Sequence, residues 1–246
     1  MLNCKKDIIL FFTRMLLGLI LFAQLTFAQY SMNFNDGGQR VSLPNASELN
    51  FYGGDPFSVE FWMLNLNSAP YDDGHLIGKR VDCGAEPSIQ FIFTNEYFAF
   101  NIPSGGVGSG IPAPYNTWMH VAVTYDTVNL IMYVNGEFVS SEPANMSSNI
   151  NASWSIGTSG TCPDSWKGYI DDFRVWDRVL EESEIQANMF LLSFSPWLYG
   201  DEEGLVGYWS FNEGQGSTVN DLTNNNNNGT LIDGASFVQA EVVSGC

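Results

Sequence analysis

The sequence predicts an all-β fold, a sandwich or jelly roll with one short helix. The main observation is that apolar residues recur at every second position in several segments, which is typical of strands with one buried face. Glycine- and proline-rich stretches separate these segments, and only Glu181–Leu192 shows helical spacing, with acids in its first turn. Of the 246 residues, 45% are hydrophobic and 14% aromatic, which is enough to form a core.

Residues 1–28 have the three parts of a cleavable secretory signal. Basic residues precede an apolar stretch, and Thr26-Phe27-Ala28 offers small residues for cleavage before Gln29. The rival interpretation is a transmembrane anchor, but the uninterrupted apolar run Met15–Ala23 is shorter than the about 20 residues that span a bilayer. No later segment is long and apolar enough to cross one. We therefore expect a protein that is secreted or held at the cell surface.

The chain is strongly acidic, with a formal net charge of −18. Removal of residues 1–28 takes away three basic residues and one acid, so the mature charge becomes −20. Such a surface repels phosphate backbones and anionic lipid heads, which excludes nucleic acid as a partner. The acidity fits a soluble exported protein, and it also offers oxygen ligands for calcium.

The strands follow from alternation of apolar side chains. In Pro56–Leu66, the residues Phe57, Val59, Phe61 and Met63 share one face, and Trp62 lies on the other. Thr117–Asp126 alternates in the same way. Two hairpins are predicted from the remaining segments before the helix. One joins Ser88–Thr94 to Tyr97–Ile102. The other joins Val128–Val134 to the strand after it through a turn at Asn135-Gly136, where both residues accept positive φ.

Three stretches rich in glycine or proline are predicted to be surface loops: Tyr52–Pro56, Ser104–Pro114 and Ser159–Pro163. Beyond the helix, residues 196–246 contain a strand at Gly204–Asn212 and another near Ser236–Glu241. The run Asn224–Asn228 between them is predicted to be a solvated turn. About 40 residues cannot bury a core alone, so we expect this tail to close the same sandwich rather than to begin a second one.

Several segments together resemble the laminin G-like (LamG-like) jelly roll of the concanavalin A-like lectin and glucanase superfamily. The residues that carry the resemblance are Ser58–Trp62, Trp118–Asp126, Ile131–Glu137, Lys167–Arg178 with Val179–Ile185, and Gly204–Gly216. The resemblance implies two antiparallel sheets stacked as a jelly roll, with residues 29–195 as the LamG-like domain. It also implies a scaffold that mainly binds sugars or proteins, although a fold alone does not give a function.

The mature chain has three cysteines, Cys83, Cys162 and Cys246. Export favours oxidation, so we expect a disulfide between Cys83 and Cys162, which would join two loops, in preference to two free thiols. Cys246 is left over and either pairs between chains or stays free. No CxxC spacing supports a zinc site.

A calcium site is implied by the resemblance. Asp36, Asp171 and Asp172 come from segments that adjoin in the resembling jelly rolls, and Asn35 stands where the family usually has an acid. Calcium takes six to eight oxygen ligands from carboxylates, amides and carbonyls, so these residues are candidate ligands. The alternative for Asp171 and Asp172 is a strand pair that points to opposite faces, one solvated and one hydrogen-bonded.

Sugar binding would use aromatic faces on loops. The candidates are Trp154, Trp166 and Tyr71, and Trp166 follows a loop that the disulfide would hold. The alternative for these side chains is core packing. The tryptophans in strand segments are predicted to lie in the core; they are Trp62, Trp118, Trp176 and Trp209.

We do not expect an enzyme. Glycoside hydrolysis needs two carboxylates about 5–9.5 Å apart, and the Glu-x-Asp-x-Glu pattern of the superfamily's hydrolases is absent. His120 lies inside a strand, where a structural role is favoured. The sequence therefore predicts a secreted binding or adhesion module, most of all for carbohydrate. The alternatives are a protein-interaction or structural domain of an extracellular assembly, and a glycoside hydrolase with an unrecognised acid pair.

Overall fold

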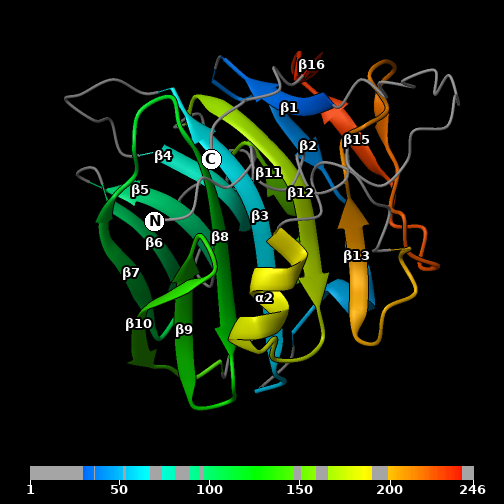
Figure 1. Cartoon of the computed structure of the whole chain (residues 1–246). Coiled ribbons are helices and arrows are strands. Elements are labelled where there is room, and N and C mark those ends of the chain that lie inside the picture. Colours follow the sequence, from blue (N-terminus) through cyan, green and yellow to red (C-terminus); the bar gives the residue numbers. More distant parts are fainter. Residues whose placement is uncertain are drawn as a thin grey trace, which may run out of the picture.

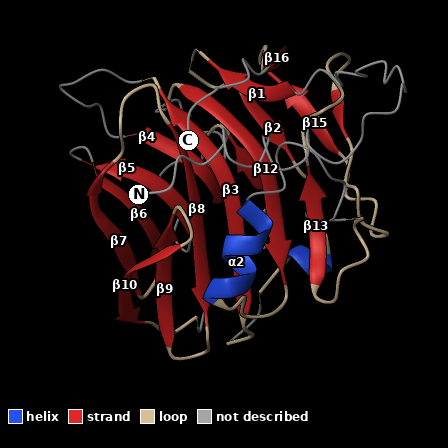
Figure 2. Cartoon of the chain, in the orientation of Figure 1, coloured by secondary structure: helices blue, strands red, loops and turns tan. Residues whose placement is uncertain are grey.

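The computed structural model describes residues 30–35, 37–51, 54–66, 74–80, 89–94, 97–146, 151–158, 166–189 and 199–239. In these ranges strands dominate, and they form two antiparallel sheets that pack against each other (Figures 1 and 2). A single short α-helix lies on one of the sheets within the described ranges (Figure 2). The predicted all-β, two-sheet antiparallel jelly-roll sandwich is confirmed. The signal at residues 1–28 lies outside the described residues.

The first sheet has the strand order β10-β9-β8-β3-β12-β1-β16, and β13 also pairs with β12. β1 pairs with the start of β12 and β13 with its end, so the two share one edge of that strand. The strands are β1 (Tyr30–Phe34), β3 (Phe57–Asn65), β8 (Trp118–Tyr125), β9 (Asn129–Val134), β10 (Glu137–Pro143), β12 (Gly168–Trp176), β13 (Leu205–Trp209) and β16 (Ser236–Gln239).

The second sheet has the order β14-β15-β2-β11-β4-β5-β6-β7. Its strands are β2 (Arg40–Ser42), β4 (Gly74–Lys79), β5 (Ile89–Thr94), β6 (Tyr97–Ile102), β7 (Gly105–Pro112), β11 (Trp154–Ile156), β14 (Thr218–Val219) and β15 (Gly229–Ile232). A 3-10 turn, η1 (Ser47–Leu49), and the helix α2 (Glu182–Met189) complete the described elements. The helix begins at Glu182, one residue after the predicted start at Glu181, and the predicted end at Leu192 lies outside the described residues.

The core lies between the sheets and consists largely of aromatic side chains. The alternating face predicted for β3 is buried, because Phe57, Val59, Phe61 and Met63 all lie in it. Phe61 meets Phe91 of the second sheet edge to face, with ring centroids 4.9 Å apart. Such contacts add about 0.5–1.5 kcal/mol beyond the area they bury.

The tail adds strands to both sheets. β13 and β16 extend the first sheet, and β15 pairs with β2 in the second. The prediction that Asn224–Asn228 is a solvated turn is wrong in part, because Asn227 is only 6% exposed. Its backbone N–H donates to the Asp221 carboxylate at 2.9 Å, and its side-chain amide donates to Glu48 at 2.8 Å. The asparagine run is thus held to the sandwich by specific hydrogen bonds.

Ser104–Pro114, predicted to be a loop, is mostly the edge strand β7. The glycines of this segment predict a loop, since glycine usually weakens a strand. Here one of them is required: a Cβ on Gly106 would lie 2.3 Å from Asn101 Oδ1 and 2.7 Å from the carbonyl oxygen of Phe100. Glycine therefore allows β7 to pair closely with β6.

Lys79 is a lysine inside the core, 1% exposed. Its Nζ donates to the carbonyl oxygen of Leu49 at 3.0 Å and to Asn50 Oδ1, and it lies 5.8 Å from the ring centroid of Trp154. Burial lowers the pKa of Lys79 from 10.5 to about 7, because an ammonium ion loses hydration there.

This shift predicts that stability depends on pH. Between about pH 7 and 10.5 the unfolded chain holds a proton on Lys79 that the folded chain has released, so the free energy of unfolding should rise with pH in that range. Lys79→Met should flatten the rise, whereas the exposed control Lys167→Met should keep it. Urea unfolding at several pH values measures the slopes, and equal slopes in the two variants would contradict the prediction.

Candidate functional site

The outer face of the first sheet, which points away from the core, is divided into two halves. Cross-strand pairing places its side chains in rows that run across the strands. In one half, Glu60 pairs with Ala122 on one side and with Arg174 on the other, and Arg174 also pairs with Tyr208. The helix α2 lies in front of this half (Figure 1). Within the described ranges, no helix covers the other half.

An apolar cluster joins α2 to its half of the sheet. Ile185 of the helix is fully buried, and Leu180 just before the helix is 1% exposed. Both pack against side chains from four strands of the sheet; these are Ala122, Tyr133, Trp176, Leu205 and Tyr208. The helix is therefore part of the folded domain and a fixed border of the uncovered half.

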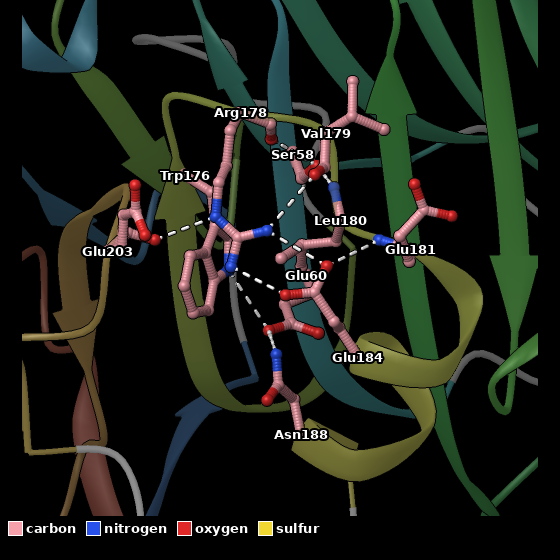
Figure 3. A network of polar contacts seen from close by, with 10 residues as sticks. All are labelled: Ser58, Glu60, Trp176, Arg178, Val179, Leu180, Glu181, Glu184, Asn188 and Glu203. Carbon is pink, nitrogen blue, oxygen red and sulfur yellow. Dashed lines mark hydrogen bonds and ion pairs between the residues drawn. The ribbon is translucent and has the colours of Figure 1, made fainter.

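Polar contacts fix the start of the helix (Figure 3). Arg178 donates to both carboxylate oxygens of Glu184, at 2.8 and 3.0 Å, and Glu184 also accepts the backbone N–H of Glu181. The Glu184 carboxylate therefore satisfies the N–H of the residue that precedes the helix. Ser58 Oγ, from β3, donates to the carbonyl oxygen of Arg178 at 2.8 Å and accepts the N–H of Leu180 at 2.9 Å, which ties the sheet to the helix entry.

Under the helix lies a cluster of buried charges. The Glu60 carboxylate is fully buried and lies 3.6 Å from Arg174 Nη1 and 3.5 Å from His120 Nε2. Burial works against its charge, but the contacts with His120 and Arg174 outweigh burial and lower the pKa of Glu60. The side chains of Trp176 and Asn188 also donate to Glu60, so helix and sheet share this one carboxylate (Figure 3). His120 is fully buried and lies between Glu60 and the ring of Trp62.

A β-bulge shapes the other side of the cluster. Asp171 pairs with Trp62 and Arg174 with Glu60, so three steps along β12 face two along β3. The extra residue places Asp172 at a φ of 51° and brings its carboxylate 3.3 Å from Arg174 Nη2. The prediction that Asp171 and Asp172 point to opposite faces is therefore wrong. Burial and the neighbouring Asp172 carboxylate raise the pKa of Asp171 well above its usual range.

The uncovered half carries a group of aromatic side chains. Trp118 and Tyr169 both pair with Leu64, one from each side, and their ring centroids lie 6.4 Å apart above it. One row along, the ring of Trp62 packs against the ring of His120 at 5.3 Å. Trp62, Trp118 and Tyr169 are partly exposed. These three side chains and Leu64 are called the aromatic site below.

Polar atoms without partners surround the aromatic site. Within the described ranges, Ser31 Oγ, Asn33 Oδ1, Trp62 Nε1 and His120 Nδ1 are buried and make no hydrogen bond. Ser31 is 1% exposed and His120 is not exposed at all. Buried polar atoms are almost always paired in folded proteins, and of these four, Asn33 Oδ1 and Trp62 Nε1 belong to partly exposed residues, where a ligand or an ordered water would supply the partner.

The two tryptophans predicted to bind sugar lie in the core instead. Trp154 and Trp166 are both 0% exposed. Their indole N–H groups donate to the carbonyl oxygen of Leu49 at 3.1 Å and to Asn65 Oδ1 at 3.0 Å. Neither ring can stack on a sugar, and the prediction is wrong for both. Tyr71, Cys83, Cys162 and Cys246 lie outside the described residues.

Conversely, Trp62 and Trp118 are partly exposed, although both are predicted to be core residues. The signal that could have found them is the alternation itself. Trp62 lies on the face of its strand opposite Phe61 and Met63, and Trp118 lies opposite Met119. A position in a strand does not by itself predict burial, because the face on which the side chain lies decides whether it is buried.

Of the predicted calcium ligands that the structure describes, Asn35 lies apart from the two aspartates. Phe34 pairs with Gly168, so the antiparallel register puts Asn35 beyond the start of β12, about 14 Å along the strand from the level of Asp171 at about 3.4 Å per residue. The Asp172 carboxylate is bound by Arg174 and by the hydroxyl of Tyr208 at 2.6 Å. Asp36 lies outside the described residues. Among the described residues, no three acidic, histidine or cysteine side chains are arranged to hold a metal ion.

Comparisons with known proteins agree on the fold. A family model described as the concanavalin A-like lectin/glucanases superfamily matches residues 35–186. A Bacteroides ovatus protein proposed to bind carbohydrate is similar in structure, with a TM-score of 0.64 and 20% identity, over 87% of this chain and 60% of that one. A heptameric SAP-like pentraxin from Limulus polyphemus has a TM-score of 0.60 and 12% identity, over 89% of this chain and 99% of that one. A search of curated proteins gave no match.

The burial of the tryptophans can be tested by stability. Trp154→Ala and Trp166→Ala should each lower the free energy of unfolding by about 3–5 kcal/mol, as expected when a large core side chain is removed. Trp118→Ala, the same chemical change at a partly exposed position, should cost clearly less. Urea unfolding followed by circular dichroism measures all three, and an equal loss at Trp118 would place that residue in the core.

Proposed function

Because the chain belongs to the concanavalin A-like lectin/glucanase superfamily, we propose that it is an extracellular carbohydrate-binding module whose ligand lies on the aromatic site. The observation that carries the proposal is the group of Trp62, Trp118 and Tyr169 on a sheet face beside unpaired polar atoms. The C–H faces of pyranoses pack on aromatic rings, and their hydroxyls need hydrogen-bond partners. The aromatic site offers both within two adjacent rows of side chains.

The charged groups near the aromatic site support binding rather than hydrolysis. Glycosidases need two carboxylates free to reach a substrate. Glu60 is fully buried and shared by His120, Arg174 and the helix, and Asp172 is held by Arg174 and Tyr208. These carboxylates serve the fold. No helix among the described residues is long and apolar enough to cross a membrane.

Two further predictions enter the proposal with their own tests. We propose export through the signal at residues 1–28 and a Cys83–Cys162 disulfide, which amino-terminal sequencing and non-reducing peptide mapping of the secreted protein would detect. Calcium binding stays a prediction, and Asp36, one of its expected ligands, lies outside the described residues. A melting temperature that falls on addition of a chelator would support it, and an unchanged one would remove it.

The ligand test uses a glycan array, run with calcium and with chelator, followed by titration calorimetry of each hit. Trp118→Ala and Tyr169→Ala should each weaken binding at least about tenfold, equivalent to about 1.4 kcal/mol. The matched control is Phe138→Ala, which removes an aromatic side chain that is 55% exposed on β10, outside the aromatic site, and should leave affinity unchanged.

Other outcomes identify the alternatives. An array without any binding would contradict the proposal and favour a protein-interaction or structural domain. Release of reducing sugar from a bound glycan would favour a hydrolase. Binding that survives both Trp118→Ala and Tyr169→Ala would place the ligand elsewhere on the protein.

A further inference from the structure

The aromatic site is one end of a longer row of side chains. Cross-strand pairs join Trp118 to Leu64, Leu64 to Tyr169, Tyr169 to Asn33, and Asn33 to Ser236. Neighbouring strands are about 4.8 Å apart, so this row of five residues spans about 19 Å across the strands. The core-facing neighbours Met32, Ile170 and Met63 confirm that the row lies on the outer face.

The two ends of the row differ in chemistry. The end formed by Trp118, Leu64 and Tyr169 is aromatic and apolar, and the end formed by Asn33 and Ser236 is polar. Ser236 is exposed, and Asn33 has a buried Oδ1 that makes no hydrogen bond. Ser31, on the same face of β1, adds an unpaired hydroxyl. A ligand that reaches from the rings to Asn33 must therefore continue along the row as a chain.

The unpaired atoms also indicate which groups the ligand carries. The indole N–H of Trp62 can only donate a hydrogen bond, and Asn33 Oδ1 can only accept one. A hydroxyl both donates and accepts, so a polyhydroxylated ligand suits both atoms.

The charge of the chain restricts the ligand further. The whole chain has a net charge of −18, so its field would repel an anionic sugar.

We propose that the ligand is a linear chain of neutral sugars that lies across the strands, from Trp118 to Ser236. This inference rests on the proposed carbohydrate-binding function and deepens it. A pyranose unit in an extended chain is close in length to one strand spacing, so the row holds roughly four units. The first units stack on Trp118 and Tyr169, and the later ones bond to Asn33 and Ser236.

Titration calorimetry with neutral oligosaccharides of increasing length tests the inference. Cello-, xylo-, laminari- and malto-oligosaccharides are the probes, with oligogalacturonides as the anionic comparison. Affinity should rise with each unit up to about four and then level off. Oligogalacturonides of the same length should bind at least about tenfold more weakly.

Variants separate the two ends of the row. Asn33→Ala should weaken binding of a tetrasaccharide roughly fivefold, the effect of one lost hydrogen bond, and leave a disaccharide unchanged. Tyr169→Ala should weaken both. Since Asn33 is partly exposed, its variant should fold, and its melting curve is the control.

The outcomes distinguish the two proposals. If neutral sugars bind but affinity does not grow beyond one or two units, or if Asn33→Ala weakens the disaccharide equally, the chain-length inference fails and carbohydrate binding stands. Equal affinity for oligogalacturonides would refute the requirement for a neutral ligand. If no neutral sugar binds at all, the proposed function itself fails.

Discussion

The contact of Arg174 with Glu60 and Asp172 is the interaction on which the outer face depends. A guanidinium that is only 1% exposed needs opposite charge close by, and two carboxylates and the ring of Tyr208 surround it, although its Nε makes no hydrogen bond. Burial would lower the pKa of Arg174, but Asp172 and Glu60 raise it. Loss of one partner would leave an uncompensated charge under the helix, so the contributions of Arg174, Glu60 and Asp172 to stability depend on one another.

The same cluster explains the division of the sheet. Glu60 accepts hydrogen bonds from Trp176 on the sheet and Asn188 on the helix, so the carboxylate that compensates Arg174 also holds α2 in place. The described helix therefore lies over the rows that carry these groups. Trp62 and Leu64 lie two and four residues further along β3 than Glu60, in the half that no described helix covers. The uncovered half is therefore a consequence of where the charges lie.

Local pattern was sufficient to predict the fold, because each strand carries its own evidence. The alternation in β3 and the turn at Asn135-Gly136 depend on neighbours in the sequence. The site was predictable only in part. Alternation separates Trp62 from Phe61 and Met63, but which of the two faces the second sheet covers is a property of the pairing. The bulge that brings Asp172 beside Arg174 likewise leaves no mark in the alternation, since it arises from the register between β12 and β3.

The arrangement also gives a physical reason for placing a binding surface on strands rather than loops. A ring that stacks on a sugar must keep its angle, and a side chain on a paired strand has few ways to move. Trp62 packs against His120 in the same row, and His120 in turn lies against Glu60, so the aromatic site borders the charged cluster. The cluster that fixes the helix thus also supports one side of the site, and a row of side chains across the strands is suited to a ligand that is itself extended.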